Sequence, residues 1–270
     1  MPSLDDHTVA RLQAVVVALL VSGIGLGAGV VLVLALSLLL VGLGAEPSPL
    51  VLLVVSLVSI QGIAFGSVAV SYLLVRGWSL ADLGVRMPSL RDLLFVVGGY
   101  VAALAAALAG AVLISVTGVP AGENQVGEFA SADPTVLLWL IPASFLLIGP
   151  GEELLFRGIV QGRLRETFEP VPGVVLASAL FAAIHFAALT GGAGGRLVTV
   201  TVLFFPALVF GAVYELTDNL VVPTLVHGAY NATLFAFAYL AFRLSESGSL
   251  EEPGRNGAAV LVEAVAALPA

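Results

Sequence analysis

The chain contains no cysteine and no lysine, and charged residues make up only 10% of its 270 positions. The lack of cysteine excludes disulfides, thiolate metal ligands and a cysteine nucleophile. All ten basic residues are arginine and the net charge is −8, which excludes nucleic acid as a partner because no polybasic surface can form. A soluble domain carries roughly a quarter charged residues. This chain therefore has too little polar surface to cover a globule in water.

Hydrophobic residues make up 59% of the chain, and its mean hydropathy is +1.10. Several apolar runs reach the roughly 20 residues that a helix needs to cross a bilayer. We therefore predict an all-α, polytopic transmembrane helix bundle of about seven (seven to eight) spans in the cell membrane. The predicted spans cover residues 13–43, 50–75, 92–117, 135–160, 171–190, 197–215 and 220–242.

The two ends of the chain carry further expectations. The first span is longer than one untilted helix requires, and its SGIGLGAG stretch predicts a bend or close packing against a neighbour. The preceding MPSLDDHTVARLQ is acidic, unlike the start of a signal peptide, so we expect the first span to be retained. The final NGAAVLVEAVAALPA is too short to cross a membrane, and we expect an interfacial or loosely docked helix there.

Charge divides the loops into two groups. The loops at 44–49 and 118–134 contain acidic residues and no arginine, whereas 76–91 and 157–169 contain three arginines each. Arginine in short loops marks the cytoplasmic side of a membrane protein. We therefore predict a cytoplasmic N-terminus and, with seven spans, an external C-terminus.

Few polar side chains lie inside the predicted spans, and such groups are costly at membrane depth unless they have a role. They are Glu152, Glu153, Arg157, His185, His227 and Asn231. At about 1.5 Å of helical rise per residue, Glu152, His227 and His185 lie about 16, 13 and 22 Å from the nearest cytoplasmic span end. These depths predict a single polar layer in the cytoplasmic half of the membrane.

Helical spacing assigns partners within this layer. Glu153 and Arg157 are four residues apart and can pair on one helix face, whereas Glu152 points about 100° away and is left without a local partner. His227 and Asn231 also share one face. The Gly149-Pro150-Gly151 sequence predicts an opened helix that frees backbone groups and admits water near Glu152.

Structural roles are the alternative for each group: a glutamate–arginine pair can be a packing device, and a lone histidine can make an interhelical hydrogen bond. Taken together, a carboxylate, two imidazoles and an amide suit hydrolysis of an acyl bond, with a general base and donors for an oxyanion. A zinc ion held by Glu152, His185 and His227 is a second interpretation, because two histidines and a glutamate form a known catalytic zinc set.

Other designs of membrane enzyme or transporter fit less well. The chain has no HExxH or GxSxG motif, and no aspartate lies in the interior of a predicted span, where it could form an aspartyl dyad. A proton-coupled permease would also use glutamate and histidine. However, repeated halves with interrupted helices are expected of such transporters, and no internal repeat is present.

Three motifs resemble one protein family. EELLFR at 152–157 matches EExxxR, FAAIH at 181–185 matches FxxxH, and HGAYN at 227–231 matches HxxxN. These are the motifs of the CPBP intramembrane proteases, which include type II CAAX prenyl endopeptidases, bacteriocin-processing proteins and Abi-type immunity proteins. The resemblance covers about residues 134–240. It divides the chain into N-terminal transmembrane helices (1–133), a catalytic helix core (134–243) and a C-terminal tail (244–270).

The resemblance implies a role for each motif residue. Glu152 with His185 would activate the water, His227 and Asn231 would stabilise the oxyanion, and Glu153 and Arg157 would support them. We therefore predict an intramembrane endopeptidase that cleaves a membrane-associated, CAAX-like or other hydrophobic substrate near the cytoplasmic face. The alternative is a non-catalytic immunity or partner-binding membrane protein of the same fold.

Overall fold

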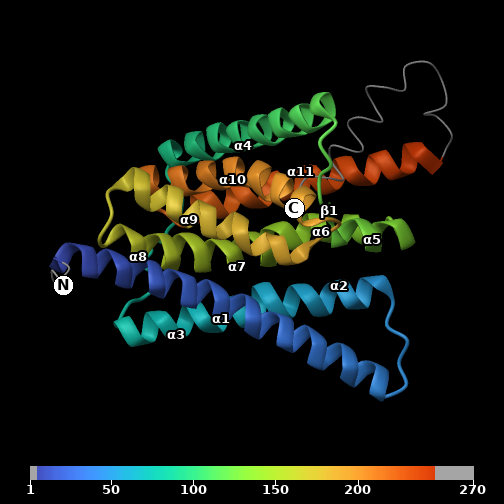
Figure 1. Ribbon diagram of the computed structural model, residues 1–270, viewed down its shortest axis with the longest axis horizontal. Helices are drawn as coiled ribbons and strands as arrows, with labels where there is room; N and C mark the ends of the chain where they lie inside the picture. The colour runs from blue at the N-terminus through green and yellow to red at the C-terminus, as the bar shows by residue number, and fades with distance from the viewer. Residues whose placement is uncertain (1–4, 247–270) are drawn as a thin grey trace.

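The computed structural model describes residues 5–246, and in this range it is a bundle of long helices with one two-residue ribbon (Figure 1). Within these residues, seven helical stretches are long and apolar enough to cross a membrane, which confirms the predicted fold class and makes this a multi-pass membrane protein. These stretches are Asp6–Gly42, Pro49–Arg76, Leu90–Thr117, Val136–Arg165, Pro170–Ala188, Ala193–Thr217 and Val221–Leu244. The expected helix at the C-terminal end lies outside the described residues.

Most of the spans are regular α-helices, and three are assembled from shorter helical pieces. The α-helices that are spans or nearly whole spans are α1 (Asp6–Gly42), α4 (Leu90–Thr117), α9 (Pro170–Ile184), α10 (Ala193–Thr217) and α11 (Val221–Glu246). The second span consists of α2 (Pro49–Leu57), the π-helix η1 (Val58–Phe65) and α3 (Gly66–Arg76). A single 3-10 turn, η4 (His185–Ala188), completes the span that α9 begins.

The span at 136–165 alternates between α-helical and π-helical turns. Its pieces are α6 (Val136–Ala143), the π-helix η2 (Ser144–Ile148), α7 (Gly149–Glu153), the π-helix η3 (Leu154–Gln161) and α8 (Gly162–Arg165). The prediction that Gly149-Pro150-Gly151 opens this helix is therefore wrong. Pro150 lies inside a continuous helix, because η2 runs directly into α7 and α7 into η3. Wide π-helical turns of this kind accommodate a local break in the regular hydrogen-bond ladder.

Two small elements lie outside the spans, between α4 and α6 and between η4 and α10. Helix α5 (Gln125–Ala132) follows strand β1 (Glu123–Asn124), which pairs antiparallel with β2 (Leu189–Thr190). The ribbon therefore ties the segment before α6 to the turn after α9. These elements lie at the end of the bundle where α4 and η4 finish.

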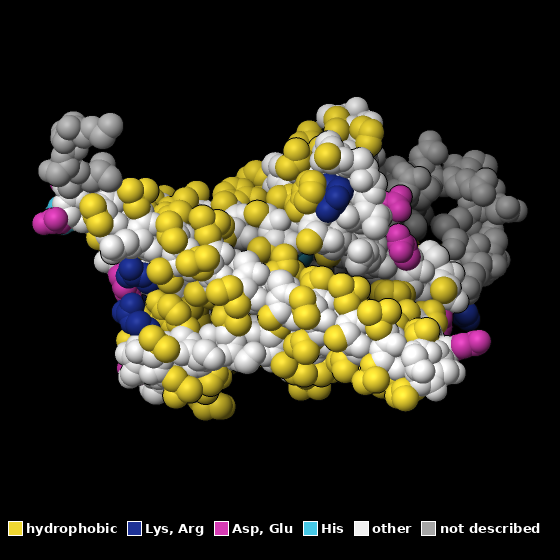
Figure 2. Space-filling view, turned by 60° about the horizontal axis from the view of Figure 1, so that its bottom comes forward, with side chains coloured by type: hydrophobic (Ala, Val, Ile, Leu, Met, Phe, Trp, Pro, Cys, Tyr) yellow, Lys and Arg dark blue, Asp and Glu magenta, His cyan; other side chains and the backbone are white. Residues whose placement is uncertain are grey.

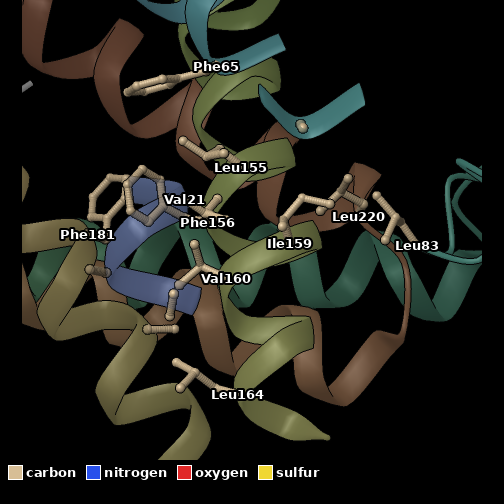
Figure 3. Close-up of a cluster of buried hydrophobic side chains, with 14 of the residues drawn as sticks. Val21, Phe65, Leu83, Leu155, Phe156, Ile159, Val160, Leu164, Phe181 and Leu220 are labelled. Atoms are coloured by element: carbon tan, nitrogen blue, oxygen red, sulfur yellow. The ribbon is translucent and has the colours of Figure 1, made fainter. Parts of the chain in front are cut away.

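The span at 136–165 lies at the centre of the bundle and is the most buried of the seven. Helices α10 and α11 separate it from α4, while α1 to α3 lie on its other side (Figure 1). Its hydrophobic side chains point into the largest core cluster, where they meet side chains of α1, η1, α9 and α10 (Figure 3). The outer faces remain apolar, and charged side chains lie mainly toward the two ends of the long axis (Figure 2). This pattern is that of a protein surrounded by lipid.

The glycines of α1 serve close packing, as predicted. A Cβ atom at Gly25 would lie 3.1 Å from the Leu155 side chain, and one at Gly29 would lie 2.9 Å from Ile60. These glycines let α1 lie directly against η1 and the central span.

Candidate active site

The structure brings Glu152 together with both membrane histidines. The Glu152 Oε2 atom is 3.9 Å from His185 Nε2 and 3.9 Å from His227 Nε2. Glu152 and His227 are buried, and the His185 side chain is 12% exposed. The predicted layer of polar groups therefore converges on one point, where three different spans meet.

Glu153 points away from Glu152, as its place in the helix predicts, and has two partners. Its Oε2 atom is 3.1 Å from Arg157 Nε, and its Oε1 atom is 2.8 Å from His227 Nδ1. The predicted pair with Arg157 is thus present, with both side chains fully buried. The bond to His227 was missed because the two residues are 74 positions apart. Arg157 also donates to the Ala207 carbonyl and lies over the Phe181 ring.

The partners of the two histidines determine which nitrogen carries the proton in the neutral ring. His227 Nδ1 faces the Glu153 carboxylate, and His185 Nδ1 is 2.7 Å from the Phe181 carbonyl oxygen. Both partners only accept hydrogen bonds, so each Nδ1 must be the donor. Each neutral imidazole therefore presents an unprotonated Nε2 toward Glu152. Phe210 stacks on the His227 ring at 4.7 Å and fixes its plane.

Asn231 lies one turn after His227 on α11 and is 1% exposed. Neither atom of its side-chain amide has a hydrogen-bond partner among the described residues. Phe235, one turn further, lines the cavity that contains Glu152. His227, Asn231 and Phe235 thus form one stripe of α11 that faces the site. An orphaned buried amide is expensive and is the kind of group that a bound ligand satisfies.

Gln61, on η1, is a site residue that the sequence analysis missed. Its Nε2 atom donates to Glu152 Oε1 at 3.2 Å, and its buried Oε1 atom has no hydrogen-bond partner among the described residues. The criterion that selected Asn231, a polar side chain inside a predicted span, applies equally to Gln61. Glu152 therefore has one oxygen bound by an amide and the other facing the two imidazoles.

Two glycines beside Glu152 explain how the neighbouring spans come so close. A Cβ atom at Gly151 would lie 2.4 Å from the Gln61 carbonyl oxygen, and one at Gly149 would lie 3.0 Å from the Thr224 carbonyl oxygen on α11. Real Cβ atoms essentially never show the first distance, and the second is tighter than nine in ten of their contacts. The glycines of GPGEE thus bring η1 and α11 against the central span, one on either side of the carboxylate.

Glu152 and His185 lie at the inner end of a cavity of about 190 Å³. Its walls are mostly apolar and come from α1, α2, η1 and the central span, with Leu26, Leu57 and Leu140 among them. Asn124, Gln125 and Phe129 of the β1–α5 segment line its other end. The size suits a side chain or a short piece of extended peptide more than a whole lipid.

The zinc interpretation can be tested against this arrangement. Ligands held at about 2.0–2.2 Å by tetrahedral zinc lie about 3.3–3.6 Å from one another, whereas Glu152 Oε2 is 3.9 Å from each Nε2 atom. No group of three His, Cys, Asp or Glu side chains in the described range 5–246 is arranged to hold a metal ion. The donor types suit zinc, but their spacing does not fit it.

The helical bundle and its buried glutamate–histidine cluster define a class: a multi-pass membrane protein with the polar groups of a hydrolase. Within it, residues 134–233 match the family model described as type II CAAX prenyl endopeptidase Rce1-like. The match contains every site residue predicted from sequence and leaves Gln61 outside. The match supports the predicted CPBP/CAAX protease family over this region of the chain. Comparisons with curated proteins and with solved structures gave no match.

Proposed function

We propose that this protein is an intramembrane endopeptidase that hydrolyses a peptide bond of a membrane-associated protein or peptide, with a glutamate-activated water as the nucleophile. The observation that carries the proposal is the position of Glu152 Oε2, 3.9 Å from the unprotonated Nε2 atoms of both His185 and His227. These three atoms are all hydrogen-bond acceptors. A water molecule is the smallest ligand that can donate to such a set.

Water held by these acceptors would have its protons directed at the protein and a lone pair directed away from it. Glu152 is the general base, because it is the anionic acceptor and takes the proton as the oxygen attacks the substrate carbonyl. His185 orients the same water through Nε2. The apolar walls of the cavity keep other water out and strengthen each of these interactions.

The attack converts the carbonyl oxygen into an oxyanion, which needs donors. Asn231 Nδ2 is buried without a partner and supplies one donor. His227 supplies a second once its Nε2 has received the water's proton from Glu152, and the Glu153 carboxylate at Nδ1 stabilises that imidazolium. The proton that Glu152 accepts is then available to the leaving amine through either imidazole.

Substitution of Glu152 by glutamine tests this assignment, because glutamine keeps the shape of the side chain and cannot accept the proton. Wild type and Glu152→Gln would be reconstituted in proteoliposomes with a fluorogenic prenylated peptide and with a peptide library. We expect kcat to fall by about 10²–10⁴-fold, the usual contribution of a general base. Glu46→Gln is the matched control, because Glu46 is an exposed carboxylate in a loop.

Three results would contradict the proposal. Cleavage by the wild type that survives Glu152→Gln would exclude Glu152 as the base. Binding of a partner protein without cleavage of any library peptide would instead support the non-catalytic alternative. Proton-coupled uptake that is lost in Glu152→Gln would support a permease.

A further inference from the structure

An open groove of about 600 Å³ lies between α4 and α10, on the outside of the bundle. Helix α4 forms one wall, and α10 and α11 separate it from the central span that carries Glu152 (Figure 1). The groove shares no lining residue with the cavity that contains Glu152. The proposed hydrolysis therefore gives it no role.

Small residues of α4 and α10 create this hollow. A Cβ atom at Gly99 would lie 2.9 Å from the Val213 side chain and 3.1 Å from that of Val226, so α4 packs directly against α10 and α11 here. Gly98 lines the groove, and a Cβ atom there would meet no atom within 4 Å. Ala102 is likewise a small residue in the lining. The groove is therefore a slender apolar space that faces the lipid.

Arg91 lies at one end of the groove, in the first turn of α4. Its side chain is exposed, its guanidinium lies 5.6 Å from the centre of the Phe95 ring, and none of the residues 5–246 forms an ion pair or hydrogen bond with it. Asp92, the nearest carboxylate in sequence, is buried and bound to Arg86 and Asn219. No described residue that lines the groove is acidic. The groove thus ends at a cation whose charge is not neutralised.

Most other arginines of the chain are already engaged. Seven of them each form an ion pair or donate to a backbone carbonyl; they are Arg11, Arg76, Arg86, Arg157, Arg163, Arg165 and Arg196. Arg91 differs from these seven because only an aromatic ring contacts its guanidinium. A phosphate is a natural partner for such a group, since the planar fork of arginine matches phosphate oxygens.

The length of the groove restricts its occupant. From Arg91 to Ala102 it runs about 16 Å at 1.5 Å of rise per residue, which is about half of a hydrocarbon core of roughly 30 Å. One acyl chain of one leaflet has this reach. A transmembrane helix, from another protein or a second copy of this chain, would span both leaflets and cover Arg91 with apolar surface, which is costly for an unpaired charge.

We propose that this groove binds one anionic phospholipid, with its phosphate on Arg91 and one acyl chain between α4 and α10. Basic pockets between transmembrane helices are sites of this kind. The lipid would contact the segment of α10 around Phe210, whose ring stacks on His227, and would stabilise the packing of α4 on α10. Lipid binding here does not require Glu152 to be catalytic, so its failure and that of the proposed function are separate outcomes.

Substitution of Arg91 tests the headgroup contact. The full chain, delipidated in detergent, would be titrated with phosphatidylglycerol or with phosphatidylcholine of the same acyl chains, and bound lipid counted by native mass spectrometry. We expect one phosphatidylglycerol to bind the wild type about 5- to 10-fold more tightly than phosphatidylcholine, the usual effect of one arginine near a phosphate. Arg91→Gln should lose this preference. Arg11→Gln is the matched control, because Arg11 is exposed at the same end and its guanidinium lies 5.5 Å from the Phe168 ring centre.

Substitution of Gly98 tests the acyl-chain contact. Gly98→Leu fills the groove without meeting another atom of the protein at its Cβ, and we expect it to lose the tightly bound lipid. Gly23→Leu is the matched control, because Gly23 is an exposed glycine of α1 that also meets nothing within 4 Å. Thermal unfolding of each variant verifies that it is folded.

Three results would overturn the lipid site. Equal affinity of the wild type for both lipids would exclude recognition of the headgroup. Equal losses in Arg91→Gln and Arg11→Gln would show general attraction to surface charge instead of a site. A dimer in the mass spectrum that disappears in Gly98→Leu would assign the groove to a second copy of the chain.

Discussion

Glu153 connects the helix that carries the carboxylates to the helix that carries His227 and Asn231. One of its oxygens meets Arg157 and the other meets His227 Nδ1. A fully buried carboxylate is stable only when its charge is compensated, and here one cation and one hydrogen-bond donor share that task. Arg157 therefore influences the histidine without touching it.

Removal of Arg157 should affect stability and activity separately. In Arg157→Leu the Glu153 carboxylate stays buried without its cation, and we expect a loss of about 3–5 kcal/mol in the free energy of unfolding. The double variant Glu153→Gln, Arg157→Leu removes both charges and should recover most of that loss. Its activity should stay low, because His227 no longer has an anion at Nδ1. Thermal unfolding in detergent and kcat measure the two effects, and full activity of the folded double variant would contradict this account.

We expect Gln61 to act on Glu152 as a positioning residue. Gln61→Leu removes the donor at Glu152 Oε1, and hydrogen bonds to charged groups contribute about 1.5–3 kcal/mol. We expect kcat to fall about 10- to 100-fold with little change in KM, because the carboxylate loses its orientation and the cavity keeps its walls. Gln13→Leu, on an exposed face of α1, is the control. A rise in KM at constant kcat would mean that Gln61 binds substrate instead.

Metal content can be predicted from the same atoms. Because Glu152 Oε2 and the two Nε2 atoms are spaced too widely for tetrahedral zinc, we expect purified active protein to contain no stoichiometric zinc. Activity should survive dialysis against a chelator. Element analysis beside the peptidase assay checks both points, and zinc that is lost together with activity would contradict them.

The three π-helices stand out among the secondary-structure elements. Gln61 lies within η1, and Glu152 and Glu153 lie on the short helix between η2 and η3. Each wide turn rotates the side chains that follow it relative to a regular α-helix, and such turns occur often at functional sites. Here the wide turns on either side of α7 set the rotation of this short helix, and with it the direction of both glutamates, relative to the neighbouring spans.

Close contact between η1 and α7 depends on Gly151. In Gly151→Ala the new Cβ atom would lie 2.4 Å from the Gln61 carbonyl oxygen. The Gln61 backbone can move away from this atom only if η1 and α7 separate. We expect a destabilisation of about 1–3 kcal/mol and a loss of activity of about 100-fold, the usual effect of a misplacement near 1 Å. Gly162→Ala on the same span meets no atom within 4 Å and should leave kcat unchanged. Equal effects of both substitutions would contradict the argument.

The elements were predicted from sequence to different degrees. The spans were predicted because each requires about 20 apolar residues in a row, a signal that a single sequence carries in full. The π-helices have no comparable pattern, and Pro150 pointed to an opening because its neighbours in space were unknown. The pair of Glu153 with Arg157 followed from helical spacing, whereas its bond to His227 depends on how distant spans pack. Gln61 could have been found, since it is an amide inside an apolar run.

At the scale of the whole molecule, the matched family region supplies the carboxylates, the histidines and the asparagine, but not the complete site. Residues 134–233 end on α11 and begin just before α6. The remaining walls come from α1, α2, η1 and the β1–α5 segment. The N-terminal spans therefore form part of the wall of the candidate site, outside the region that matches the family.

Helix α1 has 37 residues, or about 55 Å at 1.5 Å per residue, against a hydrocarbon core of about 30 Å. It runs obliquely and diverges from α2 toward the loop that joins them (Figure 1). Hydrophobic mismatch is relieved by tilting, and tilting α1 moves Leu26 and Val30 relative to Glu152. Acyl-chain length would thus act as a regulator: we expect KM to change across reconstitutions that differ only in lipid chain length, while Glu152→Gln stays inactive in all of them. The bilayer itself would then be part of the substrate-binding site.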